Sequence, residues 1–261
     1  MEEQPDTAMT QKLPDVRRDK TVPETPLPMA TSNGTQLSHV HYKRAALPYT
    51  RLIPKNDAAR VHQLEEQCRR FCLSLFFREH AHARSLGVTS SVPGEGKSFI
   101  SIMLGHILAN DSLQPVTLIE CDWENPSLHD YFGFPYAPGL AEWLRGECEE
   151  TDIRHRVNDN FYVIRAGDGQ QDAVRLLQLL AKRGLRETLP HHNHLLLLDL
   201  PPVTTSSYSL LAASLVEAVV LVVQAGFAPD QLVAEACAYL NDLPMQGIIL
   251  NQINYKPGAK Q

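Results

Sequence analysis

The sequence predicts an α/β fold: a doubly wound, mostly parallel sheet with helices on both faces. Short apolar runs rich in β-branched residues alternate with segments of helical periodicity over most of the chain after residue 56. Two of these runs, residues 195–198 and 219–223, are apolar at every position, as in strands that helices cover on both sides. A glycine-containing loop at residues 91–98 separates the first such run from the next helical segment. Together these features are typical of a doubly wound sheet.

The chain divides at about residue 55 into a proline-rich tail and the α/β domain. Seven prolines interrupt residues 1–55, and Thr, Ser, Asn and Asp fill the gaps without apolar periodicity. Prolines break helices, and a segment with so little apolar surface cannot offset the entropy lost on folding. We therefore expect residues 1–55 to form a disordered tail and residues 56–261 to form the folded domain.

The folded domain begins with a helical pattern from Asp57, its expected N-cap, to about Arg84. The predicted strands that follow are apolar and partly β-branched, at residues 86–89, 116–120, 161–165, 195–199, 218–224 and 247–253. The predicted helices between them lie at residues 98–109, 127–132, 140–144, 172–183, 207–213 and 230–240.

Composition argues against several classes of protein. The chain has 261 residues and a formal net charge of −6, so it has no global basic field with which to bind nucleic acid. Its five cysteines include no C-x-x-C pair, which favours buried free thiols in a reducing compartment. No run approaches ~20 apolar residues, and the N-terminus has no apolar signal segment. We expect a cytoplasmic protein.

Residues 91–98 read Ser-Val-Pro-Gly-Glu-Gly-Lys-Ser and match the P-loop pattern G-x-x-x-x-G-K-[ST] except at the first glycine. In such loops glycine lets backbone N–H groups surround phosphate oxygens, and the following helix N-terminus adds partial positive charge. The motif predicts a P-loop NTPase in which Lys97 reaches the β- and γ-phosphates of ATP and Ser98 binds Mg²⁺. The residues expected to contact the nucleotide are Pro93, Gly94, Glu95, Gly96, Lys97, Ser98 and Phe99.

Two predicted strands end in acidic residues. Glu120 and Asp122 lie at the end of one apolar run, two residues apart and hence on one side of an extended chain, and Asp199 ends another run. Capping or turn formation would also explain an acidic residue at such a position. Beside a P-loop, however, the apolar run that ends in Asp199 is typical of a Walker B strand. We therefore expect Glu120, Asp122 and Asp199 to serve the metal and the reaction.

Taken in order, these motifs resemble bacterial tyrosine kinases of the capsular and exopolysaccharide type (BY-kinases), in the same superfamily as the ParA and MinD ATPases. The resemblance rests on residues 89–98, residues 118–122 with 126–128 and 132–133, and residues 197–203, and it extends over roughly residues 60–254. ParA and MinD relatives carry a second lysine five residues before the P-loop lysine. Val92 stands there, which favours the kinase branch.

The resemblance implies roles for these residues. Lys97 would act on the phosphates of ATP, and Glu120 would help to activate the acceptor tyrosine hydroxyl. Asp122, Ser98 and Asp199 would organise Mg²⁺, and Asn251 would approach the adenine. The family phosphorylates tyrosines in its own C-terminal tail and regulates polysaccharide chain length and export. Many members are activated by a membrane-bound chain-length or export protein, which would place this chain at the inner face of the membrane.

The chain departs from the family pattern in four places. The usual Asp-x-Asp-x-Arg is Glu-Cys-Asp-Trp-Glu at residues 120–124, so an acid replaces the arginine. Tyr255 is the one tyrosine after the last predicted strand, which leaves a single candidate phosphosite instead of a cluster. Cys72 replaces the second arginine of a helix motif used in ring assembly, so homo-oligomer formation stays open. Asp199 is followed by Leu200 instead of threonine.

Three functions therefore remain at this point. The first is an ATP-dependent tyrosine autokinase that acts on Tyr255 or on a partner. The second is a regulatory ATPase or ATP-binding switch of the same polysaccharide machinery, with little kinase activity. The third is a positioning ATPase of the ParA or MinD kind, which Val92 disfavours.

Separately, His191, His192 and His194 lie close together in the sequence, and a surface turn explains them better than a metal site.

Overall fold

The computed structural model describes residues 58–77, 83–184 and 193–251. In these residues the chain forms α1 (Ala58–Phe76), β1 (Ser85–Ser90), α2 (Lys97–Asp111), β2 (Val116–Glu120), α3 (Leu128–Phe132), α4 (Leu140–Arg145), α5 (Glu150–Ile153), β3 (Arg154–Arg156), β4 (Phe161–Ile164), α6 (Ala173–Arg183), β5 (Leu195–Asp199), α7 (Ser209–Ala213), β6 (Ala218–Gln224), α8 (Asp230–Tyr239) and β7 (Met245–Asn251). The predicted tail at residues 1–55, the N-cap Asp57 and Tyr255 lie outside the described residues.

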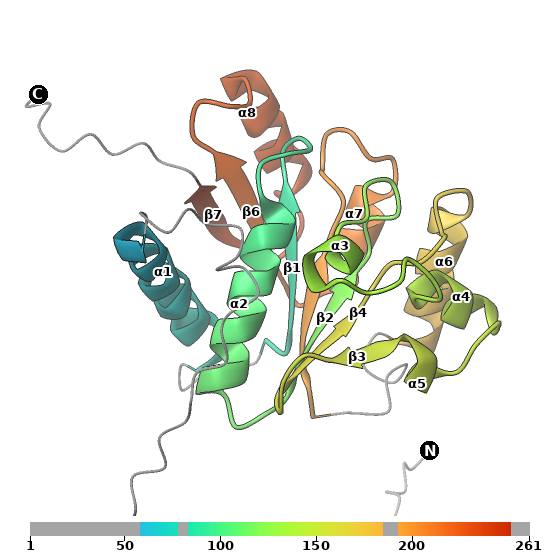
Figure 1. The fold of residues 1–261 in the computed structure, drawn as a ribbon. Helices are drawn as coiled ribbons and strands as arrows, with labels where there is room; N and C mark the ends of the chain where they lie inside the picture. Colours follow the sequence, from blue (N-terminus) through green and yellow to red (C-terminus); the bar gives the residue numbers. More distant parts are fainter. Residues whose placement is uncertain (1–57, 78–82, 185–192, 252–261) are drawn as a thin grey trace, which may run out of the picture. The chain divides into compact units, whose positions relative to one another are not determined.

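The strands form one sheet in the order β3-β4-β2-β5-β1-β6-β7 (Figure 1). Neighbouring strands are parallel except β3, which runs antiparallel to β4. β1, β2 and β5 are buried along their whole length, as expected for strands with helices on both faces. The predicted α/β, mostly parallel sheet is confirmed.

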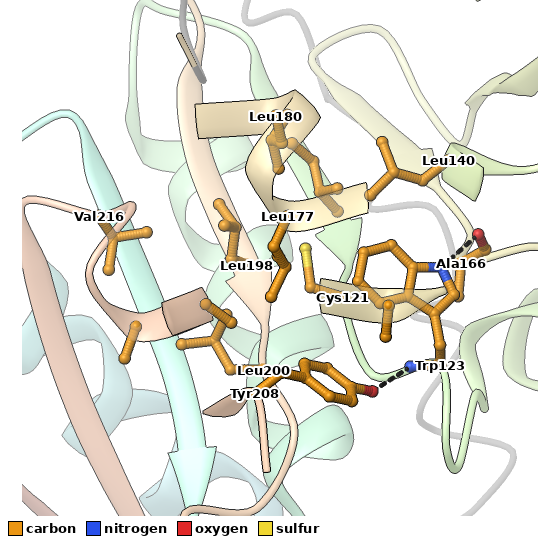
Figure 2. Packing of buried hydrophobic residues seen from close by; sticks show 14 of the residues in the cluster. Cys121, Trp123, Leu140, Ala166, Leu177, Leu180, Leu198, Leu200, Tyr208 and Val216 are labelled. Atoms are coloured by element: carbon orange, nitrogen blue, oxygen red, sulfur yellow. Dashed lines mark hydrogen bonds between the residues drawn. The ribbon is translucent and has the colours of Figure 1, made fainter. Parts of the chain in front are cut away.

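Two apolar clusters hold the helices on the two faces of the sheet. On one face, Cys68 and Cys72 of α1 and the apolar residues of α2 pack against β1 and β2. On the other face, α4, α6, α7 and α8 cover a cluster that includes Leu177, Leu198 and Trp123 (Figure 2). α2 is buried almost all round because α1 covers the side that faces away from the sheet. None of the helices in the described ranges is both long and apolar enough to cross a membrane.

The structure corrects three details of the predicted elements. The first helix ends at Phe76 rather than near Arg84, whose backbone N–H instead donates to the carboxylate of Glu217 beside the sheet. α5 and β3 were not predicted, because their short sequences, ETDI and RHR, carry no apolar periodicity. β7 begins at Met245, two residues earlier than predicted, after a register shift between Val219 and Val220 of its neighbour β6.

The parallel strands place their carboxyl ends at one edge of the sheet. In Figure 1 this is the upper edge, where the loop from β1 to α2 lies. Because β1 is flanked by β5 and β6, and β5 by β2, the loop at the end of β1 lies beside Asp199 of β5 and close to the end of β2. Ligands of open α/β sheets bind at this edge.

Candidate active site

The loop between β1 and α2 has the backbone conformation that its glycines permit. Gly94 has φ 90° and Gly96 has φ 89°, in the left-handed region that other residues adopt at a cost. Gly96 is the N-cap of α2, so the free N–H groups of the first helical turn, at Lys97 and Ser98, face the loop. Pro93 and Gly94 are exposed at its tip. This is a loop shaped to bind an anion.

The buried side chain of Glu95 holds the loop in this shape. Its carboxylate accepts the backbone N–H of Val92 at 3.0 Å and that of Gln224, the last residue of β6, at 3.2 Å. Asn251, at the end of β7, donates its side-chain amide to the backbone carbonyl of Glu95 at 2.9 Å. A Cβ on Gly96 would lie 2.3 Å from the Asn251 amide nitrogen. The loop is therefore fixed to the ends of β6 and β7 before any ligand binds.

Sequence reasoning placed Glu95 and Asn251 in the site but missed this role for both. Asn251 was expected to approach adenine, yet in this structure it is 4% exposed and its amide bonds the loop. The hydrogen bond between Asn251 and Glu95 joins residues that are 156 positions apart in the sequence. It exists only in the folded chain, so local sequence could not predict it. Phe99, also predicted to contact the nucleotide, is half-buried on α2 and packs against the cluster beneath the helix.

Lys97 lies between two buried carboxylates. Its ammonium is 2.8 Å from Asp122 Oδ2 and 3.5 Å from Asp199 Oδ1, and both carboxylates are fully buried. Burial lowers the pKa of the Lys97 ammonium, but the charges of Asp199 and Asp122 outweigh burial, and the pKa ends above its usual range. The structure thus brings together three of the residues that the sequence assigned to phosphate and metal.

The same group offers oxygen ligands to a hard cation. Asp199 accepts a hydrogen bond from the Ser101 hydroxyl at 3.4 Å, and Ser98 also bonds its carboxylate. Asp199 Oδ2 is buried and accepts no hydrogen bond from the described residues. Burial raises the pKa of the Asp199 carboxyl, against the opposing charge of Lys97. Hydroxyl and carboxylate oxygens suit Mg²⁺, which keeps several waters and phosphate oxygens as ligands. Within the described ranges, no three His, Cys, Asp or Glu residues gather in a metal-holding group.

Glu120 points to a different set of partners. Its carboxylate accepts the backbone N–H groups of Ser127 and Leu128, at the start of α3, and that of Ala166, just after β4. Burial, and then the charge of Asp199, raise the pKa of Glu120 to about 7, although the three N–H groups oppose the shift. These contacts tie α3 to the ends of β2 and β4, a role that sequence reasoning did not assign to Glu120.

The residues after Asp122 continue this connection. The backbone N–H of Trp123 donates to the Tyr208 hydroxyl at 3.0 Å, and its indole N–H donates to the Ala166 carbonyl at 2.9 Å (Figure 2). Glu124, which stands at the position where the resemblance leads us to expect arginine, accepts the Ser206 hydroxyl at 3.1 Å. Trp123 is a buried packing residue.

The histidine group shows no sign of a metal site in the part of the chain that the structure describes. His194 is buried, and its Nδ1 lies 2.9 Å from the Thr117 hydroxyl on β2. His191 and His192 lie outside the described residues.

The chain was compared with known proteins. No family model matches it. It is 28% identical to the tyrosine-protein kinase etk of Escherichia coli K12 over 171 residues, 64% of this chain and 23% of that protein. It is 32% identical to the putative tyrosine-protein kinase EpsB of Ralstonia solanacearum over 136 residues, 52% of this chain and 18% of that protein. The chain thus spans less than a quarter of these two relatives.

A shorter relative and two solved structures agree with these matches. The tyrosine-protein kinase CpsD of Streptococcus agalactiae is 28% identical over 173 residues, 65% of this chain and 75% of that protein. The kinase domain of Escherichia coli tyrosine kinase ETK superposes with a TM-score of 0.65 and 26% identity, over 76% of this chain and 80% of that one. The chimerical protein CapA2B2 shares the fold, with a TM-score of 0.66 and 23% identity over 71% of this chain and 83% of that one. By sequence and fold, the chain is similar to bacterial tyrosine-protein kinases.

Proposed function

We propose that this chain binds ATP with Mg²⁺ and transfers the γ-phosphoryl group to tyrosine, as part of the control of capsule or exopolysaccharide synthesis and export. The observation that carries the proposal is the buried group of Lys97, Asp122 and Asp199 beside a P-loop already fixed by Glu95. The similarity to tyrosine-protein kinases supports tyrosine as the acceptor.

The residues of the site suggest how it would work. Phosphate oxygens at the N-terminus of α2 would compete with Asp122 and Asp199 for the Lys97 ammonium. Lys97 would then turn to the β- and γ-phosphates, and the two carboxylates, with Ser98, would be free to hold Mg²⁺. The bound metal supplies charge stabilisation for the phosphoryl group in transit. Lys97 would thus neutralise the two carboxylates before ATP and Mg²⁺ bind.

Glu120 remains a proposed activator of the acceptor hydroxyl, as the resemblance implies. To act in that way, its carboxylate would have to leave the N–H groups of Ser127 and Leu128. The acceptor itself would be Tyr255 or a tyrosine of a partner protein. By resemblance, that partner is a membrane-bound chain-length or export protein that activates a cytoplasmic kinase at the inner face of the membrane. Self-association is a further proposal, and no nucleic acid is expected as a partner, given the net charge of −6.

One specific observation favours a second candidate, a regulatory ATP-binding switch with little kinase activity. Glu124 places a carboxylate where the resemblance leads us to expect arginine, and it adds a negative charge two residues after Asp122 in the sequence. With Glu120 held by three N–H groups, the site then has fewer groups free to promote transfer. A positioning ATPase of the ParA or MinD kind is less favoured, because Val92 occupies the position of their second lysine.

Incubation with ATP and Mg²⁺ followed by phosphotyrosine detection separates the two candidates. The kinase proposal predicts a phosphotyrosine signal that Lys97→Met abolishes. The switch predicts ATP binding and nucleotide-dependent partner association without that signal. If wild-type protein yields no phosphotyrosine, alone or with a membrane activator, the kinase proposal fails. Equal partner affinity with ATP, with ADP and without nucleotide rules out the switch.

A further inference from the structure

An aromatic ring lies half-exposed beside the P-loop. Phe227 follows β6 in the loop that leads to α8, and 51% of its surface is accessible. Gly226, with φ 71°, makes the turn that brings Phe227 back towards the sheet edge. The backbone N–H of Phe227 donates to the carbonyl of Gln224 at 3.2 Å, which closes the turn.

The ring lies beside the tip of the P-loop. A Cβ placed on Gly94 would be 3.5 Å from Phe227 Cζ and 3.7 Å from Cε1, so the ring edge lies close to the tip of the loop. Only part of the ring is covered, because about half of the residue stays accessible. A large apolar surface is thus presented to solvent directly beside the loop that would hold the phosphates.

The loop that carries Phe227 is fixed to the same partners as the P-loop. Gln224 donates its backbone N–H to the Glu95 carboxylate, and the N–H of the next residue, Ala225, donates to the Asn251 carbonyl at 3.0 Å. Ring and P-loop are therefore held in one arrangement by Glu95 and Asn251. A ligand that touches both would find its two contacts already in place, which lowers the entropy lost on binding.

Among the described residues, the contacts of Lys97, Asp122 and Asp199 account for phosphate and metal but not for the base of a nucleotide. Asn251, predicted to approach adenine, is 4% exposed, and its side-chain amide donates a hydrogen bond to the Glu95 carbonyl. An aromatic face stacks on any nucleobase, because every base has a π-face. We propose that Phe227 is the nucleobase contact of the site, on which the purine ring of a nucleotide bound by the P-loop stacks. This inference rests on the proposed binding of ATP.

Stacking without hydrogen bonds to the base edge recognises a class of ligand, not one base. The arrangement therefore favours nucleoside triphosphates over phosphates without a base and discriminates weakly among the bases. Inorganic tripolyphosphate offers the same phosphates without a base. It would bind the P-loop without touching Phe227, which provides a direct control for the role of the ring.

Calorimetric titration of ATP and of tripolyphosphate, each with Mg²⁺, tests the proposal. Phe227→Ala should weaken ATP binding about tenfold and leave tripolyphosphate binding unchanged, and Phe227→Trp should restore ATP binding. Phe77→Ala is the matched control, since Phe77 is 42% exposed at the end of α1 and should affect neither ligand.

Two results would overturn the inference while the proposed function stands. One is equal ATP affinity of the wild type and Phe227→Ala. The other is an equal loss of ATP and tripolyphosphate binding in Phe227→Ala, which would mean that the ring acts through its proximity to Gly94. If the wild type binds neither ligand, the proposed function fails and this inference fails with it.

Discussion

Removal of the Lys97 charge is expected to destabilise the folded protein even when no nucleotide is bound. Lys97→Met keeps most of the side-chain volume but leaves the fully buried carboxylates of Asp122 and Asp199 without a cation. Breaking a buried ion pair from one side costs about 3–5 kcal/mol, because the remaining charge is uncompensated. The loss comes from the folded state, so it should appear without nucleotide.

Protonation of one carboxylate sets an upper limit to this loss. Burial already raises the pKa of Asp199 above its usual 3.8, and loss of Lys97 raises it further. The Asp199 carboxyl has a pKa of 3.8 in the unfolded chain. Protonating it at pH 7 therefore costs the folded state at most about 4 kcal/mol of free energy, at about 1.4 kcal/mol per pH unit. At pH 5 the same limit is about 1.6 kcal/mol. An acid with a raised folded pKa destabilises more as pH rises, so the defect should shrink as pH falls.

Urea unfolding of both proteins at pH 7 and pH 5 measures this difference. The expected loss in the free energy of unfolding is about 3–4 kcal/mol at pH 7 and less than about 2 kcal/mol at pH 5. Lys182→Met is the matched control, because Lys182 is exposed in the last turn of α6 and its loss should cost less than about 0.5 kcal/mol. A loss at pH 7 as small as that of the control, or one independent of pH, would refute the reasoning.

Three further predictions concern the groups around the site. Glu95→Gln should lower the free energy of unfolding by about 1–3 kcal/mol, because the amide oxygen cannot accept the N–H groups of both Val92 and Gln224, and hydrogen exchange should quicken in the P-loop. Glu120, with a folded pKa of about 7 against 4.5 unfolded, makes stability fall by up to about 3 kcal/mol as pH rises between these values. Glu120→Gln should remove that slope in urea titrations, and an unchanged slope would contradict the assignment. Gly169→Ala should cost about 1–3 kcal/mol and shift the fluorescence of Trp123, since its Cβ would lie 2.4 Å from the indole. Gly133→Ala, which meets nothing within 4 Å, should cost about 1 kcal/mol from its positive φ alone.

The sheet was predictable because each buried strand is an apolar run of its own. Residues 195–199 and 218–224 show this most clearly, and both became central strands. Once those strands are parallel, their carboxyl ends must share one edge, so the meeting of Lys97, Asp122 and Asp199 followed from topology. β3 was not predicted, because its three residues form a strand only by pairing with β4.

The roles of Glu120 and Glu95 were not predictable from local sequence. Glu120 and Asp122 are two residues apart and would lie on the same side of an extended chain, and this spacing predicted a common role. After β2 the chain leaves the extended conformation, so Glu120 bonds the N–H groups of Ser127, Leu128 and Ala166, while Asp122 faces Lys97. Glu120 and Ala166 form a hydrogen bond although they are 46 residues apart, and a contact at that separation cannot be predicted from a single sequence.

Calorimetric titration of wild-type protein and Lys97→Met with ATP, in the presence of Mg²⁺ and under conditions where both are folded, tests the central claim most directly. The account predicts one saturable ATP site per chain in the wild type, with binding that weakens when Mg²⁺ is removed and that is lost in Lys97→Met. Absence of ATP binding by the folded wild type, or equal binding by the two proteins, would contradict it.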